Sequence, residues 1–309
     1  MKKRIGVLTS GGDAPGMNAA VRAVTRTALY KGFEVIGIQR GYNGLLNREF
    51  VQLDVRAVSD IIQRGGTMIY TARCPEFKEW ENIEKAKQIC EDKGMCGIVV
   101  IGGDGSFRGA ADLSKAGIPC VGIPGTIDND IQCTEYTIGY DTALNTVVDL
   151  VDKLRDTSHS HERCSVVEVM GRHAGHIALN AGIACGATAV LVPEVECDLG
   201  KVVQRIKEVR ADGKKHIIII VAEGIGGTEQ IAEQIEKETG IESRATILGH
   251  VQRGGSPTLR DRVLASEMGY YAVELLEQGI GNRVVGRKDG KVYDVDIQEA
   301  LAMQKPFDE

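Results

Sequence analysis

Short apolar runs rich in β-branched residues alternate with helical patterns along almost the whole 309-residue chain. Continuous apolar runs of this kind are typical of buried parallel strands. The predicted strands are Ile5–Thr9, Glu34–Ile38, Gly97–Ile101, Cys120–Ile123, Cys164–Met170, Thr188–Val192 and His216–Ala222. The predicted helices are Met17–Tyr30, Ile83–Asp92, Phe107–Ala116, Val202–Val209, Gln230–Lys237 and a long one whose apolar face runs from Leu144 to Leu154. This βαβ repetition predicts a doubly wound α/β fold.

The length of the chain suggests two domains rather than one. We expect the division near Gly139, just before the long helix, with a second crossing near Val251. We therefore predict two similar doubly wound, Rossmann-like domains with mainly parallel sheets. The larger would comprise residues 1–138 and about 251–301, and the smaller residues 139–250 and about 302–309.

Charge and cysteine usage narrow the class of protein. The net charge of −6 argues against a nucleic-acid binder and means that an anionic substrate needs locally placed Arg and Lys. The 8 cysteines form no Cys-x-x-Cys pair, which favours buried, reduced thiols, as at Cys120 and Cys164. Met1–Thr9 has no signal-peptide pattern, and no apolar stretch is long enough to span a membrane. We expect a cytoplasmic protein.

Glycine is abundant, with 38 residues, and it gathers at the turns that follow predicted strands. The first such turn, Ser10–Asn18, opens a helix and could cradle a phosphate with its backbone N–H groups. It lacks the Lys-Ser/Thr of a Walker A loop, and a plain tight turn is an equally good interpretation.

The turn at Gly102–Ser106 has an Asp flanked by glycines. It does not fit a dinucleotide fingerprint, because Gly109 comes one residue too late. Asp104 suits Mg²⁺ held beside a polyphosphate.

The turn at Pro124–Asp130 carries two carboxylates in the order Thr-Ile-Asp-Asn-Asp. Carboxylates this close perturb one another, so one of them could be poised as a proton acceptor. Alone, the loop could equally be an Asx-turn that caps backbone N–H groups.

Five arginines lie on separate glycine- or turn-flanked segments of this acidic protein. Guanidinium groups placed in this way suit bidentate capture of phosphates, although a single Arg is usually a solvated surface residue. They are Arg73, Arg163, Arg172, Arg244 and Arg253.

The ordered set of motifs closely resembles the bacterial ATP-dependent 6-phosphofructokinases, over essentially the whole chain. The motifs are Gly-Gly-Asp-x-Pro-Gly-Met-Asn, Gly-Gly-Asp-Gly-Ser, Pro-Gly-Thr-Ile-Asp-Asn-Asp, Met-Gly-Arg and Gly-His-Val-Gln-Arg-Gly-Gly-Ser-Pro. Each is short, but the set in this order is highly specific. The resemblance implies transfer of the γ-phosphoryl of MgATP to the 1-hydroxyl of fructose 6-phosphate, the committed step of glycolysis. It also implies that the larger domain binds ATP and the smaller binds the sugar phosphate.

The resemblance also implies residue roles. Asp128 would be the base, and Arg172 and Thr126 would stabilise the transferring phosphoryl group. The residues implied for ATP are Gly12, Arg73, Cys74, Gly103, Asp104, Gly105 and Ser106, with Asp104 also binding Mg²⁺. The residues implied for the sugar phosphate are Thr126, Ile127, Asp128, Asp130, Arg163, Met170, Gly171, Arg172, Glu223, Arg244, His250, Val251, Gln252 and Arg253.

Two glycines indicate the phosphoryl donor. Relatives that use pyrophosphate resemble the same frame but have Asp at the position of Gly105 and Lys at that of Gly125. We expect glycine at both positions to leave space open for the nucleotide, so ATP is the predicted donor.

In the family, residues matching Arg163 and Arg244 reach the 6-phosphate from a neighbouring subunit, which implies an oligomer, usually a homotetramer. The family's effector pocket, for ADP and phosphoenolpyruvate, is matched by Arg22, Arg26, Arg155, Gly186, Lys214, Lys215 and His216. Thr188 and Asp212 stand where many members have Glu and Lys, so we expect weakened or altered regulation.

Several alternatives stay open at this point. The chain could be a pyrophosphate-dependent phosphofructokinase, an NAD or lipid kinase that shares Gly-Gly-Asp-Gly, or a catalytically silent sugar-phosphate sensor. A metal-dependent hydrolase could use His173 and His176, although the sequence offers no obvious third ligand.

Overall fold

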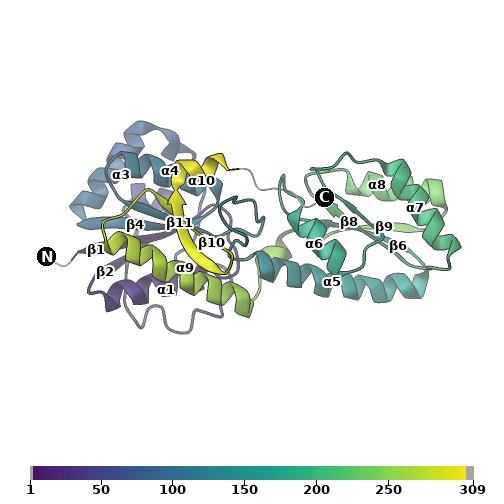
Figure 1. Cartoon of the computed structure of the whole chain (residues 1–309), viewed down its shortest axis with the longest axis horizontal. Helices are drawn as coiled ribbons and strands as arrows, with labels where there is room; N and C mark the ends of the chain where they lie inside the picture. The colour runs from purple at the N-terminus through teal and green to yellow at the C-terminus, as the bar shows by residue number, and fades with distance from the viewer. Residues whose placement is uncertain (1–2, 304–309) are drawn as a thin grey trace. The chain divides into compact units, whose positions relative to one another are not determined.

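A computed structural model describes residues 3–303 and divides them into two compact units (Figure 1). The first unit comprises residues 3–127, 131–141 and 253–303, and the second comprises residues 128–130 and 142–252. The predicted domain boundaries and their ligand assignments stay predictions. Residues 304–309, which the prediction gives to the smaller domain, lie outside the described residues.

The first unit is built on a seven-stranded sheet in the order β11-β10-β5-β4-β1-β2-β3. Its strands are β1 (Arg4–Ser10), β2 (Glu34–Ile38), β3 (Phe50–Leu53), β4 (Met95–Gly102), β5 (Cys120–Pro124), β10 (Arg283–Lys288) and β11 (Lys291–Asp296). The five strands from β10 to β2 run parallel, whereas β3 and β11 are antiparallel edge strands. Consequently β1, β4 and β5 end side by side.

Helices cover both faces of this sheet. They are α1 (Met17–Tyr30), α2 (Gly41–Leu46), η1 (Pro75–Lys78), α3 (Trp80–Asp92), α4 (Asp104–Lys115), α9 (Leu259–Glu277) and α10 (Ile297–Ala302). α1 packs against α9 on one face, and α3, α4 and α10 lie on the other (Figure 1). α9 begins at an N-cap, Thr258, whose hydroxyl accepts a hydrogen bond from the N–H of Asp261 at 3.3 Å.

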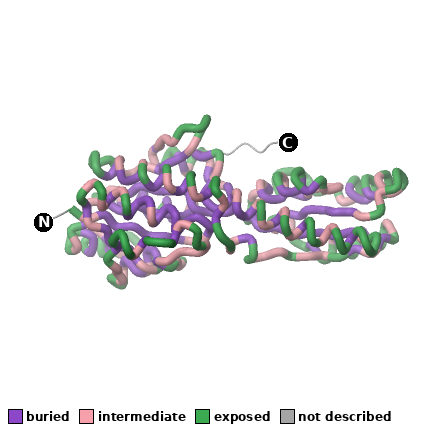
Figure 2. The backbone as a smooth tube through the Cα atoms, turned by 90° about the horizontal axis from the view of Figure 1, so that it is seen from below, coloured by how far each residue is buried: buried purple, intermediate pink, exposed green. Residues whose placement is uncertain are grey.

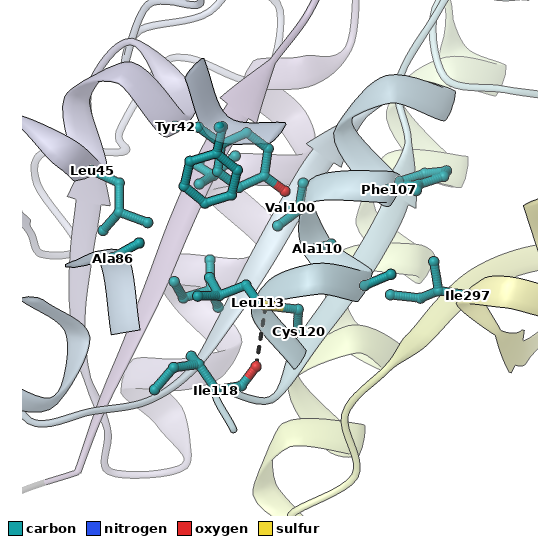
Figure 3. Close-up of a cluster of buried hydrophobic side chains, with 14 of the residues drawn as sticks. Tyr42, Leu45, Ala86, Val100, Phe107, Ala110, Leu113, Ile118, Cys120 and Ile297 are labelled. Carbon is teal, nitrogen blue, oxygen red and sulfur yellow. Dashed lines mark hydrogen bonds between the residues drawn. The ribbon is translucent and has the colours of Figure 1, made fainter. Parts of the chain in front are cut away.

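A hydrophobic core cluster joins α2, α3, α4 and α10 to the sheet (Figure 3). Phe107 and Leu113 of α4 are fully buried in it, together with Ile297 of α10. Tyr42 stacks on Phe77 with ring centroids 4.0 Å apart. This packing fixes the start of α4, and therefore the turn that precedes it, against the sheet.

The second unit has a four-stranded, wholly parallel sheet in the order β7-β8-β6-β9. The strands are β6 (Cys164–Val169), β7 (Ala189–Leu191), β8 (Ile217–Ala222) and β9 (Ser243–Ile247). The helices are α5 (Tyr140–His161), α6 (His176–Ala184), α7 (Leu199–Ala211) and α8 (Thr228–Thr239), and the short η2 (Gly249–Arg253) follows β9. Every residue of β8 is buried, which its unbroken apolar run predicts. In Figure 2 the buried backbone, in purple, runs through the interior of each unit.

The predicted fold class is confirmed, because both sheets are mainly parallel and alternate with helices in the chain. The predictions omit α2, α6, α9, α10 and the strands β3, β9, β10 and β11. β3, β10 and β11 are partly exposed and carry polar residues, so they lack the continuous apolar run that marks the central strands.

Cys120 and Cys164 are buried free thiols, as predicted. Burial raises the pKa of both, that of Cys164 to about 12. Among residues 3–303, no helix is long and apolar enough to cross a membrane.

Candidate active site

The turn after β1 is shaped by glycines and leads into α1. Gly11 and Gly16 have φ angles of 87° and 101°, in the left-handed region that favours glycine. α1 then begins at Met17, and no side chain caps its first turn. A helix start of this kind, behind a glycine turn, suits an anion.

Gly12 lies directly against Arg253. A Cβ atom at Gly12 would be 2.5 Å from Arg253 Nη1, so only glycine leaves room for the guanidinium in this position. The same Nη1 donates a hydrogen bond to the carbonyl of Asp13 at 3.1 Å. The structure thus brings together a residue predicted for ATP and one predicted for the sugar phosphate.

The turn after β4 is bonded to the turn after β1. Ser106 Oγ donates to the carbonyl of Ser10 at 3.1 Å, and a Cβ atom at Gly102 would meet that carbonyl oxygen at 2.5 Å. The buried Tyr42 donates its hydroxyl proton to the carbonyl of Ser106 at 2.6 Å. Sequence reasoning missed Tyr42, because nothing in its local pattern indicates a partner in a turn so far along the chain.

Asp104 is the first residue of α4, and its carboxylate is partly exposed. Arg108, one helical turn further on, pairs with it at 3.0 Å. Next to it, a Cβ atom at Gly105 would meet nothing within 4 Å. A single carboxylate beside open space fits Mg²⁺, which takes most of its ligands from phosphate oxygens and water.

The loop after β5 runs beside the β4 turn. The N–H of Gly125 donates to the carbonyl of Gly102 at 3.0 Å, and a Cβ atom at Gly103 would be 3.9 Å from Thr126 Cβ. The hydroxyl of Thr137 donates to the carbonyl of Thr126 at 2.6 Å, so the backbone at Thr126 is fixed. The structure therefore places Thr126 next to the Gly103–Ser106 turn.

The two glycines predicted to leave open space differ. Gly105 faces open space, as expected. At Gly125, however, a Cβ atom would lie 3.0 Å from Ile101 Cγ2 and 3.3 Å from Met17 Cε. The expectation is wrong for Gly125, because its missing side chain points into packed apolar groups.

Asp128 and Arg172 form an ion pair in the second unit. Arg172 Nε lies 3.4 Å from Asp128 Oδ2, and the Asp128 side chain is only 2% exposed whereas that of Arg172 is 50% exposed. Between the two carboxylates of the loop, Asn129 takes a left-handed conformation with φ of 52°. The geometry keeps the Asp128 carboxylate away from bulk water and beside the Arg172 guanidinium.

Arg172 itself has a left-handed backbone, with φ of 56°, which costs energy for a residue other than glycine. Glu223, directly after β8, compensates: its Oε1 accepts the N–H of Arg172 at 2.6 Å and that of Gly171 at 3.1 Å. Gly171 is required as well, because a Cβ atom there would be 2.3 Å from the carbonyl oxygen of Ala174. Glu223 thus orients the arginine that pairs with Asp128.

Gln252 is fully buried and bridges two loops. Its Oε1 accepts the N–H of Met170 at 3.1 Å, and its Nε2 donates to the carbonyl of Gly249 at 3.0 Å. The amide therefore ties η2, which carries the exposed His250 and Val251, to the turn after β6.

Arg163 and Arg244 lie elsewhere on the second sheet. Arg163 precedes β6 and Arg244 is the second residue of β9, so both are at amino ends, whereas Arg172 and Glu223 follow carboxyl ends. Both arginines pair with Glu242. Arg163 Nε lies 2.7 Å from Glu242 Oε2, and Arg244 Nη2 lies 2.6 Å from Glu242 Oε1. These ion pairs lower the pKa of Glu242. Arg244, which the sequence analysis places on a glycine- or turn-flanked segment, is part of a paired strand.

The residues predicted for effectors are distributed over both units. Arg22 and Arg26 lie on α1, Arg155 on α5, Gly186 after α6, and Lys214, Lys215 and His216 before β8. Within the second unit, Arg155 donates to the carbonyl of Cys185, and Lys214 Nζ donates to Thr188 Oγ1 at 3.2 Å. Burial, followed by the charge of Arg155, lowers the pKa of both Lys214 and His216. Crowding of positive groups in this way favours an anion.

His176 is the first residue of α6, and His173 lies in the turn that precedes this helix. In the part of the chain from residue 3 to 303, no three His, Cys, Asp or Glu side chains are arranged to hold a metal ion. The geometry therefore gives the metal-dependent hydrolase no support.

Taken together, the doubly wound fold, the glycine turns at the ends of β1 and β4, and the buried Asp128 beside Arg172 define a phosphoryl-transferring α/β protein. A family model described as phosphofructokinase matches residues 4–276. The chain belongs to the phosphofructokinase family.

Similar proteins agree with this assignment. The ATP-dependent 6-phosphofructokinase 1 of Clostridium perfringens is 61% identical over 307 residues, which are 99% of this chain and 96% of that protein. The ATP-dependent 6-phosphofructokinase of Clostridium botulinum is 59% identical over the same shares.

Solved structures show the same fold. Phosphofructokinase from Saccharomyces cerevisiae is 35% identical with a TM-score of 0.91, and the match covers 97% of this chain but only 45% of that one. Pichia pastoris phosphofructokinase in the T-state is 36% identical with a TM-score of 0.93, and the match covers 98% of this chain and 36% of that one.

Proposed function

We propose that this protein transfers the γ-phosphoryl group of MgATP to the 1-hydroxyl of fructose 6-phosphate and releases fructose 1,6-bisphosphate and ADP. The observation that carries the proposal is the buried Asp128 carboxylate, paired with Arg172 at 3.4 Å. It lies two residues after Thr126 in a loop that follows a central strand. The Clostridium relatives named above are ATP-dependent 6-phosphofructokinases, which supports the choice of substrates.

Asp128 accepts the proton of the 1-hydroxyl as the oxygen attacks the γ-phosphorus. The bond from the γ-phosphorus to the bridging oxygen of ADP breaks, and negative charge on the transferring group is balanced by Arg172 and by the Thr126 hydroxyl. Because Thr126 and Asp128 are two residues apart, the chain itself keeps their Cα atoms within about 7 Å. A phosphoryl group held by Thr126 is therefore within reach of Asp128.

The nucleotide phosphates are held by Gly12, Arg73, Cys74 and the Gly103–Ser106 turn, and Asp104 holds Mg²⁺. When bound, Mg²⁺ supplies positive charge to the phosphate oxygens of ATP. The open space beside Gly105 supports ATP over pyrophosphate, since Asp stands there in relatives that use pyrophosphate. Gly125 does not add to this argument, because its neighbourhood is packed.

The sugar phosphate contacts Ile127, Asp130, Met170, Gly171, Glu223, His250, Val251 and Arg253, and Gln252 belongs to the same group of residues. Gln252 acts through the loops that it ties, since its side chain is buried. Arg163 and Arg244 serve the active site of a neighbouring subunit of a homotetramer. Their place at the amino ends of β6 and β9, away from Arg172, supports that arrangement.

Regulation and location follow the family. ADP and phosphoenolpyruvate bind at Arg155, Gly186, Lys214, Lys215 and His216 together with Arg22 and Arg26, and the protein works in the cytoplasm. Thr188, whose hydroxyl is bonded to Lys214, offers no carboxylate for a metal that accompanies ADP. Regulation is therefore weaker than in members with Glu at this position.

A donor-by-acceptor matrix tests the proposal. ATP and pyrophosphate, each with Mg²⁺, are combined with fructose 6-phosphate and with other ketose phosphates, and product is measured with and without phosphoenolpyruvate. We expect turnover only when ATP is the donor, and the fastest turnover when fructose 6-phosphate is the acceptor. Turnover with pyrophosphate alone would identify the other donor class, and binding of fructose 6-phosphate without any turnover would identify a sensor.

A further inference from the structure

Arg73 lies near the end of a long irregular segment. Residues 54–74, between β3 and η1, form no helix or strand. Arg73 is exposed, and it has no hydrogen-bond or ion-pair partner within residues 3–303. Because an irregular backbone has many accessible conformations, the position of Arg73 depends on what fixes the segment.

Asn18, in the first turn of α1, fixes one part of this segment. Its side chain is buried, and Nδ2 donates to the carbonyls of Arg64 and Gly65, both at 3.1 Å. Its Oδ1 accepts the N–H of Met68 at 2.7 Å. Both donors and the acceptor of the amide are used, and all three partners belong to one short stretch of backbone.

Residues closer to Arg73 are bonded to β1 and to the turn that follows it. Thr71 Oγ1 donates to the carbonyl of Gly11 at 2.8 Å, and Thr9 Oγ1 donates to the carbonyl of Tyr70 at 2.8 Å. Thr71 is two residues before Arg73, so the chain keeps the Arg73 Cα within about 7 Å of that of Thr71.

These contacts run from α1 through residues 64–73 to the glycine turn. We propose that Asn18 is a positioning residue for ATP binding, which holds Arg73 beside the Gly11–Gly12 turn through residues 64–73. The inference rests on the proposed role of Arg73 at the nucleotide phosphates. Asn18 does not touch the nucleotide itself, and its effect passes through the backbone that it fixes.

Asn18→Asp is the most direct test. The two side chains have the same shape, but the carboxylate loses both N–H donors and places negative charge against two carbonyl oxygens. We expect the KM for ATP to rise about tenfold, while kcat and the KM for fructose 6-phosphate change less than about twofold. Asn47→Asp is the matched control, because Asn47 is an exposed residue whose Nδ2 also donates to a carbonyl, that of Asn43 at 3.0 Å. It should change none of the three constants.

A double-mutant cycle with Arg73→Ala separates positioning from general structural damage. If Asn18 acts through Arg73, the double variant has the same KM for ATP as Arg73→Ala alone. If the two substitutions raised the KM for ATP independently, so that their fold-changes multiplied in the double variant, the proposal would be overturned. An unchanged KM for ATP in Arg73→Ala would overturn it too, by removing the role of Arg73, while the wild-type enzyme would still turn over ATP. Absence of ATP turnover in the wild type would instead contradict the proposed function.

Thr71→Val keeps the test decisive if Asn18→Asp does not fold. This change removes only the hydroxyl that bonds to Gly11, in a partly exposed residue of the same segment. We expect a rise of about threefold in the KM for ATP that disappears in the Arg73→Ala background. If Thr71→Val still raised the KM for ATP in the Arg73→Ala background, the proposal would be contradicted. The same result with Asn18→Asp would contradict it equally.

Discussion

The loops at the carboxyl ends of the two sheets are built in different ways. In the first unit, the turns after β1 and β4 are shaped by glycines, and their backbones contact one another directly, as Gly102 and Ser10 do. In the second unit, the turn after β6 contains a non-glycine residue with a left-handed backbone, Arg172, held by the carboxylate of Glu223. The loops of the first unit rely on missing side chains, whereas the turn after β6 needs the charged side chain of Glu223 in addition to the glycine at Gly171. A substitution in the first unit should therefore act by filling space that a glycine leaves open. A substitution in the second unit should act by changing a hydrogen bond or a charge.

The largest expected effect lies at the ion pair between Asp128 and Arg172. Asp128→Asn removes the proton acceptor but keeps the shape of the side chain beside Arg172, so kcat should fall about a thousandfold. Steady-state ADP release checks this, with circular dichroism to confirm folding. Asp149→Asn, an exposed residue of α5 paired with Lys153, is the control and should retain wild-type turnover. If Asp128→Asn kept kcat within about threefold of wild type, the base would have to be another group.

The sequence predicts the first set of loops better than the second. The turns after β1, β4 and β5 are visible because glycines and acidic residues follow apolar runs within a few positions. The bonds from Glu223 to Gly171 and from Tyr42 to Ser106 join residues far apart in the chain, and no local pattern indicates such partners. The packing around Gly125 was equally hidden, since only the folded core shows that its missing side chain faces Ile101. The predicted strand Cys164–Met170 already separates Arg163 from Arg172, whereas the separation of Arg244 depends on β9, which the sequence analysis does not predict.

Gln252 tests the dependence of the second set on hydrogen bonds. Gln252→Glu keeps an acceptor for the N–H of Met170 but turns the donor to the Gly249 carbonyl into a buried negative charge. We expect the free energy of unfolding to fall by about 2 kcal/mol. Urea denaturation followed by circular dichroism measures it, with the exposed Gln230→Glu as the matched control. An unchanged midpoint would mean that water or a shifted loop replaces the bridge.

Gly12 tests whether filling space in the first set of loops changes the affinity for substrate without changing stability. Its φ is not in the left-handed region, so Gly12→Ala has no backbone strain, and the new Cβ meets only the far end of Arg253. The guanidinium can swing away, so the melting temperature should stay unchanged. If Arg253 binds the sugar phosphate, however, the KM for fructose 6-phosphate should rise about tenfold. A loss of affinity for ATP alone would indicate that the new methyl group disturbs the nucleotide phosphates held at Gly12 and that Arg253 is not displaced.

Gly105 should show the smallest effect, and it separates the need for glycine from the need for space. A Cβ atom there meets nothing within 4 Å, and the residue is the second of α4, where Ala is the better helix former. Gly105→Ala should therefore leave the KM for ATP within about twofold and raise the free energy of unfolding by about 0.5 kcal/mol. Steady-state kinetics and urea denaturation measure the two quantities. A large loss of ATP affinity would place the nucleotide in contact with Gly105, so that even a methyl group intrudes. A wild-type KM would mean that a larger or charged side chain, such as the Asp of relatives that use pyrophosphate, is needed to exclude ATP at this position.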